Sequence, residues 1–159
     1  MSYRRSLLLL VAATACLQVL VIIVADLDRP PWGDEAHFVQ TVRLFAQEPT
    51  LETLRTYPEM SGPLPFAMYA AWGKVAGLEL WTLRLLSVVI AFLSYLLLHR
   101  LAWRLFQHGT AALLIALFFA VHPYTIGFSI FVFTDGPAMC FVLLTLLGAH
   151  RRQAWLVGI

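Results

Sequence analysis

Apolar residues gather into four long segments that are separated by polar stretches. These segments cover residues 7–25, 80–103, 111–126 and 131–149. A helix of about 20 apolar residues is long enough to cross the hydrocarbon core of a bilayer. The pattern therefore predicts an all-α, polytopic membrane protein with about four transmembrane helices, in which residues 1–159 form a single transmembrane module. Another apolar segment begins near the end of the chain, so we expect this module to be incomplete at its C-terminus.

The first apolar segment predicts a retained span rather than a cleaved signal peptide. Arg4 and Arg5 precede it, as they could in either case. The segment is longer than the apolar region of most signal peptides, however, and Asp26 and Asp28 follow it where a small-residue cleavage site would be needed.

The polar stretch between the first two spans, residues 26–79, is expected to form an outer loop with two helices at the membrane surface. Within residues 34–47, Val42 and Phe45 fall on one helical face, opposite polar side chains. An amphipathic helix of this kind lies in the interface between lipid and water. Residues 64–76 are apolar but too few to span a bilayer, and they predict a second interfacial helix.

The composition supports this assignment to the membrane. Hydrophobic residues make up 60% of the chain and charged residues only 13%, whereas a soluble domain carries about a quarter charged residues. The formal net charge of +2 gives no reason to expect a nucleic-acid partner. The lipid bilayer is the expected surrounding.

The charged residues are divided between the two sides of this layout. The arginines that flank the spans share one side with the N-terminus, whereas all nine acidic residues fall on the other side or at its edge. The flanking arginines are Arg4, Arg5, Arg100, Arg104, Arg151 and Arg152. An excess of Lys and Arg marks cytoplasmic loops. We therefore expect an integral protein of the cytoplasmic or an ER-type membrane, with a cytoplasmic N-terminus and residues 26–79 in the periplasm or a lumen.

Asp34 and Glu35 are the first candidates for catalysis. They follow the first span directly and open the amphipathic helix. Carboxylates at a bilayer edge are costly to desolvate, so they mark a functional site by default. One could act as general base on an acceptor hydroxyl while the other positions it or helps to hold a divalent cation. The alternative is that Asp34 only caps the helix.

Asp135 is the third candidate carboxylate. It lies at the outer end of the fourth apolar segment, on the same side and at the same depth as Asp34. We expect these carboxylates to converge on one outward-facing cavity, with Asp34 and Asp135 as the pair that could hold a metal ion. The alternative is a turn residue ahead of Gly136 and Pro137.

His37, Lys74 and Arg84 are candidates for substrate binding. His37 lies one helical turn after Asp34, where it could contact a phosphate. Lys74 and Arg84 are cations of the outer side, and a phosphate group at the bilayer surface needs such partners. The alternative for His37 is a residue simply exposed at the interface. For the two cations it is snorkelling, in which the stem lies in lipid and the charge in water.

Several short motifs occur in an order that resembles the N-terminal part of the GT-C glycosyltransferases, which use polyprenyl-phosphate sugars. The motifs are residues 32–35 (WGDE), 62–66 (GPLPF), 83–87 (LRLLS), 101–106 (LAWRLF), 122–123 (HP) and 134–137 (TDGP). The chain is thus similar to glycosyltransferase family 39, the protein O-mannosyltransferases, and to the lipid A aminoarabinose transferases and dolichyl-phosphate-glucose glucosyltransferases.

The resemblance implies roles for several of these residues. In the superfamily the first outer loop carries an acidic catalytic motif, matched here by Asp34 and Glu35. A further acid comes from the outer end of the fourth span, matched by Asp135. The donor is a sugar on dolichyl or undecaprenyl phosphate, and some members need a metal. Some relatives also carry a basic residue before the proline pair of the second loop helix; residues 59–62 offer none here, so another cation must bind the phosphate.

Two hypotheses follow. The first is a membrane glycosyltransferase, or its N-terminal half working with a C-terminal half or another subunit, that transfers a sugar to an acceptor hydroxyl on the outer side. The second is a non-catalytic membrane remnant or subunit that binds a lipid or a partner protein. The two differ in whether the carboxylates are needed for sugar transfer.

Overall fold

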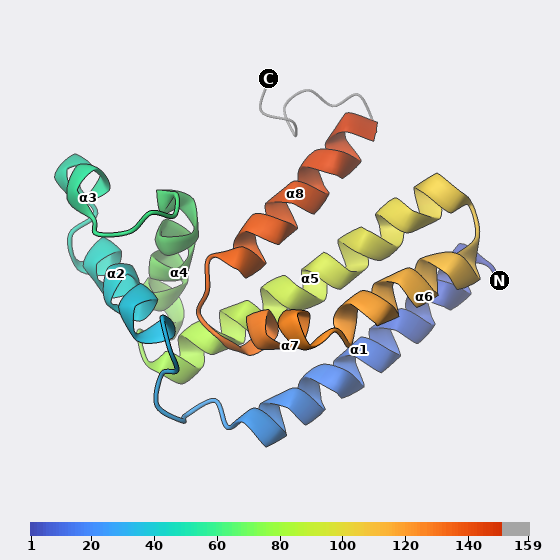
Figure 1. Cartoon of the computed structure of the whole chain (residues 1–159), viewed down its shortest axis with the longest axis horizontal. Helices are drawn as coiled ribbons and strands as arrows, with labels where there is room; N and C mark the ends of the chain where they lie inside the picture. The colour runs from blue at the N-terminus through green and yellow to red at the C-terminus, as the bar shows by residue number, and fades with distance from the viewer. Residues whose placement is uncertain (151–159) are drawn as a thin grey trace.

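A computed structural model describes residues 1–150, and this part of the chain is all-helical, with eight helices and no strand (Figure 1). The helices are α1 (Tyr3–Ala25), α2 (Glu35–Gln47), α3 (Leu51–Thr56), α4 (Pro63–Ala76), α5 (Leu80–Phe106), α6 (Gly109–Ala120), α7 (Pro123–Ile130) and α8 (Asp135–His150). The expected fourth-span flank at Arg151 and Arg152, and the further apolar segment after them, lie outside the described residues.

Two helices are long and apolar enough to cross a membrane. They are α1 and α5, with 23 and 27 residues, which correspond to lengths of about 35 and 40 Å at 1.5 Å per residue. They lie alongside each other and α6 in Figure 1. These apolar helices support an all-α membrane protein, and both coincide with expected spans.

The third apolar segment differs from the single helix expected over residues 111–126. Helix α6 ends at Ala120, α7 begins at Pro123, and their axes are bent by 68°. Proline has no N–H to continue a helix and pushes the residue before it out of the helical region, and His122 is indeed extended. The bent pair could form one span, which would bring the number of candidate spans in the described residues to three. The expected count of four stays a prediction, because α8 starts at Asp135 and is short.

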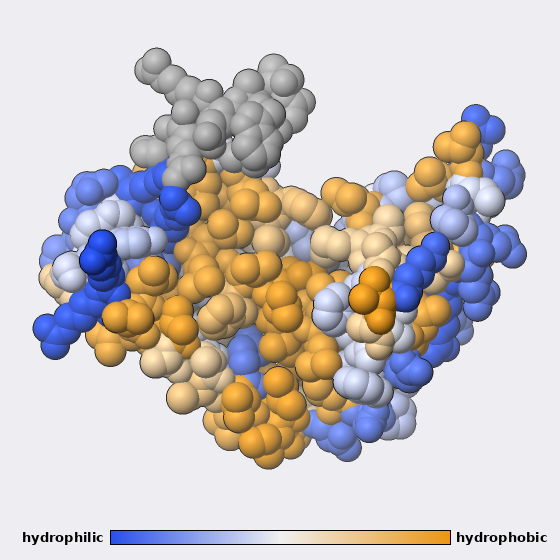
Figure 2. All heavy atoms as spheres, turned by 180° about the vertical axis from the view of Figure 1, so that it is seen from behind, coloured by the Kyte–Doolittle hydropathy of each residue, from blue (hydrophilic) through white to orange (hydrophobic). Residues whose placement is uncertain are grey.

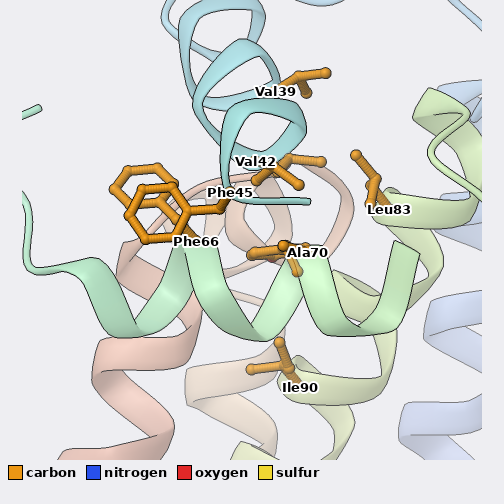
Figure 3. Close-up of a cluster of buried hydrophobic side chains, with 9 residues drawn as sticks. Val39, Val42, Phe45, Phe66, Ala70, Leu83 and Ile90 are labelled. Atoms are coloured by element: carbon orange, nitrogen blue, oxygen red, sulfur yellow. The ribbon is translucent and has the colours of Figure 1, made fainter. Parts of the chain in front are cut away.

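Helices α2, α3 and α4 form a unit at one end of α5 (Figure 1). The apolar face of α2 packs against α4 and α5, so this face is inside the protein (Figure 3). Full burial of a large apolar side chain contributes about 1.5–3 kcal/mol, which makes this cluster the main apolar support of the loop helices. Its labelled members in Figure 3 are Val39, Val42, Phe45, Phe66, Ala70, Leu83 and Ile90.

The opposite end of the molecule joins the first turn of α1 to the last turns of α5. The ring of Tyr3 packs against His99 and Trp103, with centroids 5.4 and 5.3 Å apart. The hydroxyl of Ser6 lies 3.0 Å from His99 Nε2. Figure 2 shows a broad band of apolar side chains between two polar ends. The nine acidic residues all belong to residues 26–79 or to the start of α8, so they sit together at the α2–α4 end.

Replacing Phe66 with alanine is expected to lower the free energy of unfolding by about 3–5 kcal/mol, because this side chain is only 1% exposed at the centre of the cluster. The matched control is Leu64→Ala on the same helix, where the side chain is 57% exposed and the expected loss is about 0.5 kcal/mol. Chemical unfolding in detergent micelles, followed by tryptophan fluorescence, measures both. Equal losses would contradict a core between α2, α4 and α5.

Candidate functional site

A tight turn sets the direction in which the acidic pair enters α2. Gly33 has a φ of +57°, a left-handed conformation that glycine adopts without steric cost. The amide of Glu35 donates to the carbonyl of Trp32 across this turn, at 3.2 Å. The carbonyl of Asp34 then accepts from the amides of His37 and Phe38, each at 3.1 Å, and so begins the helix.

Glu35 points into the protein and forms an ion pair with Arg84 of α5. The guanidinium donates from Nε to Oε1 at 2.9 Å and from Nη2 to Oε2 at 2.6 Å. The two side chains are 0% and 1% exposed. Such a bidentate pair is both strong and geometrically specific, and both charges are buried, so each depends on the other for compensation.

The remaining polar atoms of the pair are also satisfied by the protein. Arg84 Nη1 donates to the carbonyls of Leu27 and Arg29, at 2.7 and 2.8 Å. Glu35 accepts from the amide of Val132 at 3.0 Å and from that of Trp32 at 3.2 Å. The pair therefore connects the turn after α1, the start of α2, α5 and the segment between α7 and α8.

Glu35 and Arg84 are bonded to each other and to the protein backbone. The sequence analysis expected Glu35 among the catalytic carboxylates and Arg84 near a phosphate. In the structure both side chains are bonded to the protein and withdrawn from solvent, so in the described state neither presents a free group to a ligand.

A second set of hydrogen bonds fixes the segment at residues 131–134. Ser87 on α5 donates to the carbonyl of Phe131 at 2.8 Å and lies 2.7 Å from the Tyr69 hydroxyl of α4. Burial raises the pKa of Tyr69 above its ordinary value, so its hydroxyl stays protonated and donates to Ser87. The hydroxyls of Ser61 and Thr134 are 3.2 Å apart. These contacts hold the backbone that leads directly into Asp135.

Asp34 and Asp135 differ from Glu35 in being exposed to solvent. The capping alternative for Asp34 predicts a hydrogen bond from its carboxylate to a first-turn amide, but the structure contains no such bond. Asp135 is the first residue of α8. Asp135 follows residues 131–134 directly along the chain. Asp34 is the neighbour of Glu35, whose carboxylate accepts from the amide of Val132. Within residues 1–150 neither carboxylate has a hydrogen-bond or ion-pair partner.

Arg29 is a cation at this site that the sequence analysis did not single out. Its guanidinium carbon lies 4.8 Å from the centroid of the Phe131 ring, within the range of a cation–π interaction. Trp32 stacks on the same ring, with centroids 5.8 Å apart. In the part of the chain that the structure describes, the Arg29 guanidinium has no carboxylate partner. Its place five residues before Asp34, in the same short turn, was the signal that could have identified it.

Among the described residues, His37 and Lys74 take no part in the contacts around Arg29 and Phe131. His37 Nε2 lies 3.3 Å from the Glu59 carboxylate, which also accepts from Thr41. Lys74 is exposed in the last turn of α4, about 17 Å along the helix from Pro63 at 1.5 Å per residue. The structure thus joins Arg29 and Glu35, the neighbour of Asp34, to residues 131–132, and it places Lys74 in the last turn of α4.

The structure has a hollow at the start of α2, and its described residues offer few side chains that could bind a metal ion together. A hollow of about 250 Å³ adjoins the start of α2 and includes Pro31, Ala36, Gln40 and Arg43 in its lining. Among the described residues, no group of three or more His, Cys, Asp or Glu side chains could hold a metal ion. A Mg²⁺ ion needs only one or two carboxylates when phosphate and water complete its shell, so a metal at Asp34 and Asp135 stays a prediction.

Comparison with known proteins gives one match. A family model described as dolichyl-phosphate-mannose-protein mannosyltransferase matches residues 60–156, which is more than half of the chain. The match includes Arg84 and Asp135, whereas Asp34 and Glu35 precede it. No curated protein and no solved structure matches the chain significantly.

Replacing Arg84 with glutamine is expected to lower the free energy of unfolding by about 3–5 kcal/mol, because the Glu35 carboxylate is left buried without its partner. Arg43→Gln is the matched control, since Arg43 is an exposed cation with one long hydrogen bond to the Leu78 carbonyl at 3.5 Å; its loss costs at most about 1 kcal/mol. Unfolding in detergent micelles measures the difference. A melting curve for Arg84→Gln that matches the control would rule out the pair as a structural support.

Proposed function

Because the chain belongs to the dolichyl-phosphate-mannose-protein mannosyltransferase family, we propose that Asp34 is the general base of a membrane glycosyltransferase whose donor is a polyprenyl-phosphate sugar. Membership confirms the resemblance to GT-C enzymes. The observation that carries the residue assignment is the contrast between two neighbours. Glu35 is buried and bonded to Arg84, whereas the Asp34 carboxylate on the same turn is exposed and has no partner within residues 1–150.

The proposed step moves one proton and exchanges one bond. Asp34 accepts the proton of an acceptor hydroxyl as its oxygen attacks the anomeric carbon of the donor sugar. The new carbon–oxygen bond forms as the bond between the anomeric carbon and the phosphate oxygen breaks. The electron pair of the broken bond leaves with the polyprenyl phosphate. Attack from the face opposite the leaving phosphate inverts the anomeric centre.

Arg29 is proposed to bind the phosphate of the donor. It is the cation nearest in sequence to Asp34, and among residues 1–150 it has no carboxylate partner. Its guanidinium lies over Phe131, in the segment that leads to Asp135. Arginine recognises phosphate through parallel hydrogen bonds. The cation–π contact with Phe131 would keep the guanidinium oriented while its N–H groups stay available. Arg29 therefore takes the role that the sequence analysis had given to Arg84.

Other expected residues take supporting roles in this proposal. Asp135 would accept hydrogen bonds from sugar hydroxyls, or share a divalent cation with Asp34 and the donor phosphate. His37 and Lys74 would meet parts of the donor or acceptor that lie away from the reacting carbon. The chain would act at the outer or lumenal face, with its N-terminus in the cytoplasm, since Arg4, Arg5, Arg100 and Arg104 all lie at the end opposite the carboxylates.

Asp34→Asn is expected to lower the rate of sugar transfer about 10²- to 10⁴-fold without changing stability, because the side chain is exposed and makes no cap. The measurement supplies labelled polyprenyl-phosphate sugars to membranes that carry the chain. Asp28→Asn is the matched control, an exposed acid in the same loop that should keep full activity. Full transfer by Asp34→Asn would refute the proposed base. Transfer absent from the wild-type chain, with insertion verified, would favour the non-catalytic alternative.

Arg29→Gln is expected to raise the KM for the donor about ten-fold, because a charge-assisted hydrogen bond is worth roughly 1.5–3 kcal/mol. Arg55→Gln, an exposed cation at the end of α3, is the control and should leave this KM unchanged. Initial rates measured over a range of donor concentrations separate KM from kcat. An unchanged donor KM in Arg29→Gln would contradict phosphate binding by this residue.

A further inference from the structure

We propose that a groove between α1, α5 and α8, at the end opposite Asp34, binds a phospholipid with an anionic head group. The groove has a volume of about 390 Å³, which is within the usual range for small-molecule sites. It adjoins a second hollow of about 260 Å³, and the two share Tyr3 and Arg100. This site is remote from the proposed active site and goes beyond the proposed function.

The groove is a built feature of the helix packing. The Ser6–His99 hydrogen bond and the rings around Tyr3 fix the first turn of α1 against α5. Arg104 Nη1 donates to the carbonyl of Leu147 at 3.4 Å, which joins α5 to α8 at the same end. These contacts join α1 and α8 to α5 at the end where the groove lies.

The inner part of the groove suits an acyl chain. Its lining is almost entirely aliphatic and comes from all three helices: Leu7, Leu93, Leu96, Leu97, Cys140 and Leu144. None of these side chains carries a charge. An acyl chain that enters this space from the bilayer exchanges contacts with lipid tails for contacts with equally apolar side chains.

The outer part of the groove suits a phosphate. Arg100 is exposed at its mouth and has no hydrogen-bond or ion-pair partner within residues 1–150. The second hollow adds Trp103, Arg104 and Gln107, whose side chains all include N–H donors, and its lining has no carboxylate. Arginine is the residue that best matches phosphate geometry, and Trp and Tyr favour the level of lipid head groups.

The charge balance favours an anionic head group over a zwitterionic one. Both lining cations face a surface on which the described residues place no acid, since every acidic residue belongs to residues 26–79 or to the start of α8. Among the described residues, a choline or ethanolamine group would therefore find no counter-charge here. Anionic lipids also enrich the cytoplasmic leaflet, which is the side that the flanking arginines indicate.

The first test is lipid binding to the purified chain in detergent, followed by native mass spectrometry with phosphatidylglycerol and phosphatidylcholine. We expect saturable binding that favours phosphatidylglycerol, and we expect Arg100→Gln to weaken it about five-fold, the effect of one basic residue near an anionic lipid. Arg4→Gln is the matched control, because it removes one charge from the same end outside the groove. Equal weakening by both variants would overturn the proposal, because it would show diffuse attraction without a site.

A second variant tests the apolar part. Leu97→Trp fills the groove and should remove binding of both lipids, whereas Val19→Trp, on the exposed face of α1, should leave binding intact. Circular dichroism verifies that each variant stays helical. If the tryptophan variant does not fold, the comparison of Arg100→Gln with Arg4→Gln still tests the proposal. No saturable binding by the wild-type chain would also overturn the proposal, since another helix or a second copy would then cover the groove.

Discussion

The buried ion pair between Glu35 and Arg84 is the interaction on which the α2–α4 end of the molecule depends. Two opposite charges in an apolar interior are costly to desolvate, and the cost is repaid only if every polar atom finds a partner. Here the guanidinium and the carboxylate bond to each other and to the backbone of two further segments, the turn after α1 and the segment between α7 and α8. Because these bonds have fixed lengths and directions, the pair defines how the loop after α1, helix α2 and residues 131–134 sit on α5.

This constraint explains why two adjacent carboxylates can serve different purposes. In a helix, neighbouring side chains point about 100° apart, so an inward Glu35 leaves Asp34 facing outward. Glu35, the inward residue, holds this turn in place. The chemistry proposed for Asp34 would need that rigidity, because a general base must be held within hydrogen-bond reach of its substrate. Phe131 is likewise held by several contacts at once. Its ring contacts Arg29 and Trp32, and its carbonyl accepts from Ser87.

The sequence was most informative where periodicity and length decide the structure. The long apolar segments predicted α1 and α5, and the recurrence of Val42 and Phe45 predicted the amphipathic α2. It was less informative where distant residues meet. Nothing in the sequence relates Glu35 to Arg84, 49 residues away, so both were expected at a ligand. Arg29 was not singled out because its contact with Phe131 joins distant parts of the chain. The bend at Pro123 was not expected because apolar residues continue across it.

The separation of Glu35 from its partners along the chain has a consequence for biosynthesis. Arg84 follows Glu35 by 49 residues, and Val132 follows it by 97. At about 5–20 residues per second, a ribosome delivers the arginine roughly 2–10 s after the glutamate and the valine amide roughly 5–20 s after it. During this interval the loop after α1 must remain hydrated, since its carboxylate has nothing to neutralise it. The loop can therefore dock on the membrane helices only late, after α5 and the turn before α8 have both been inserted.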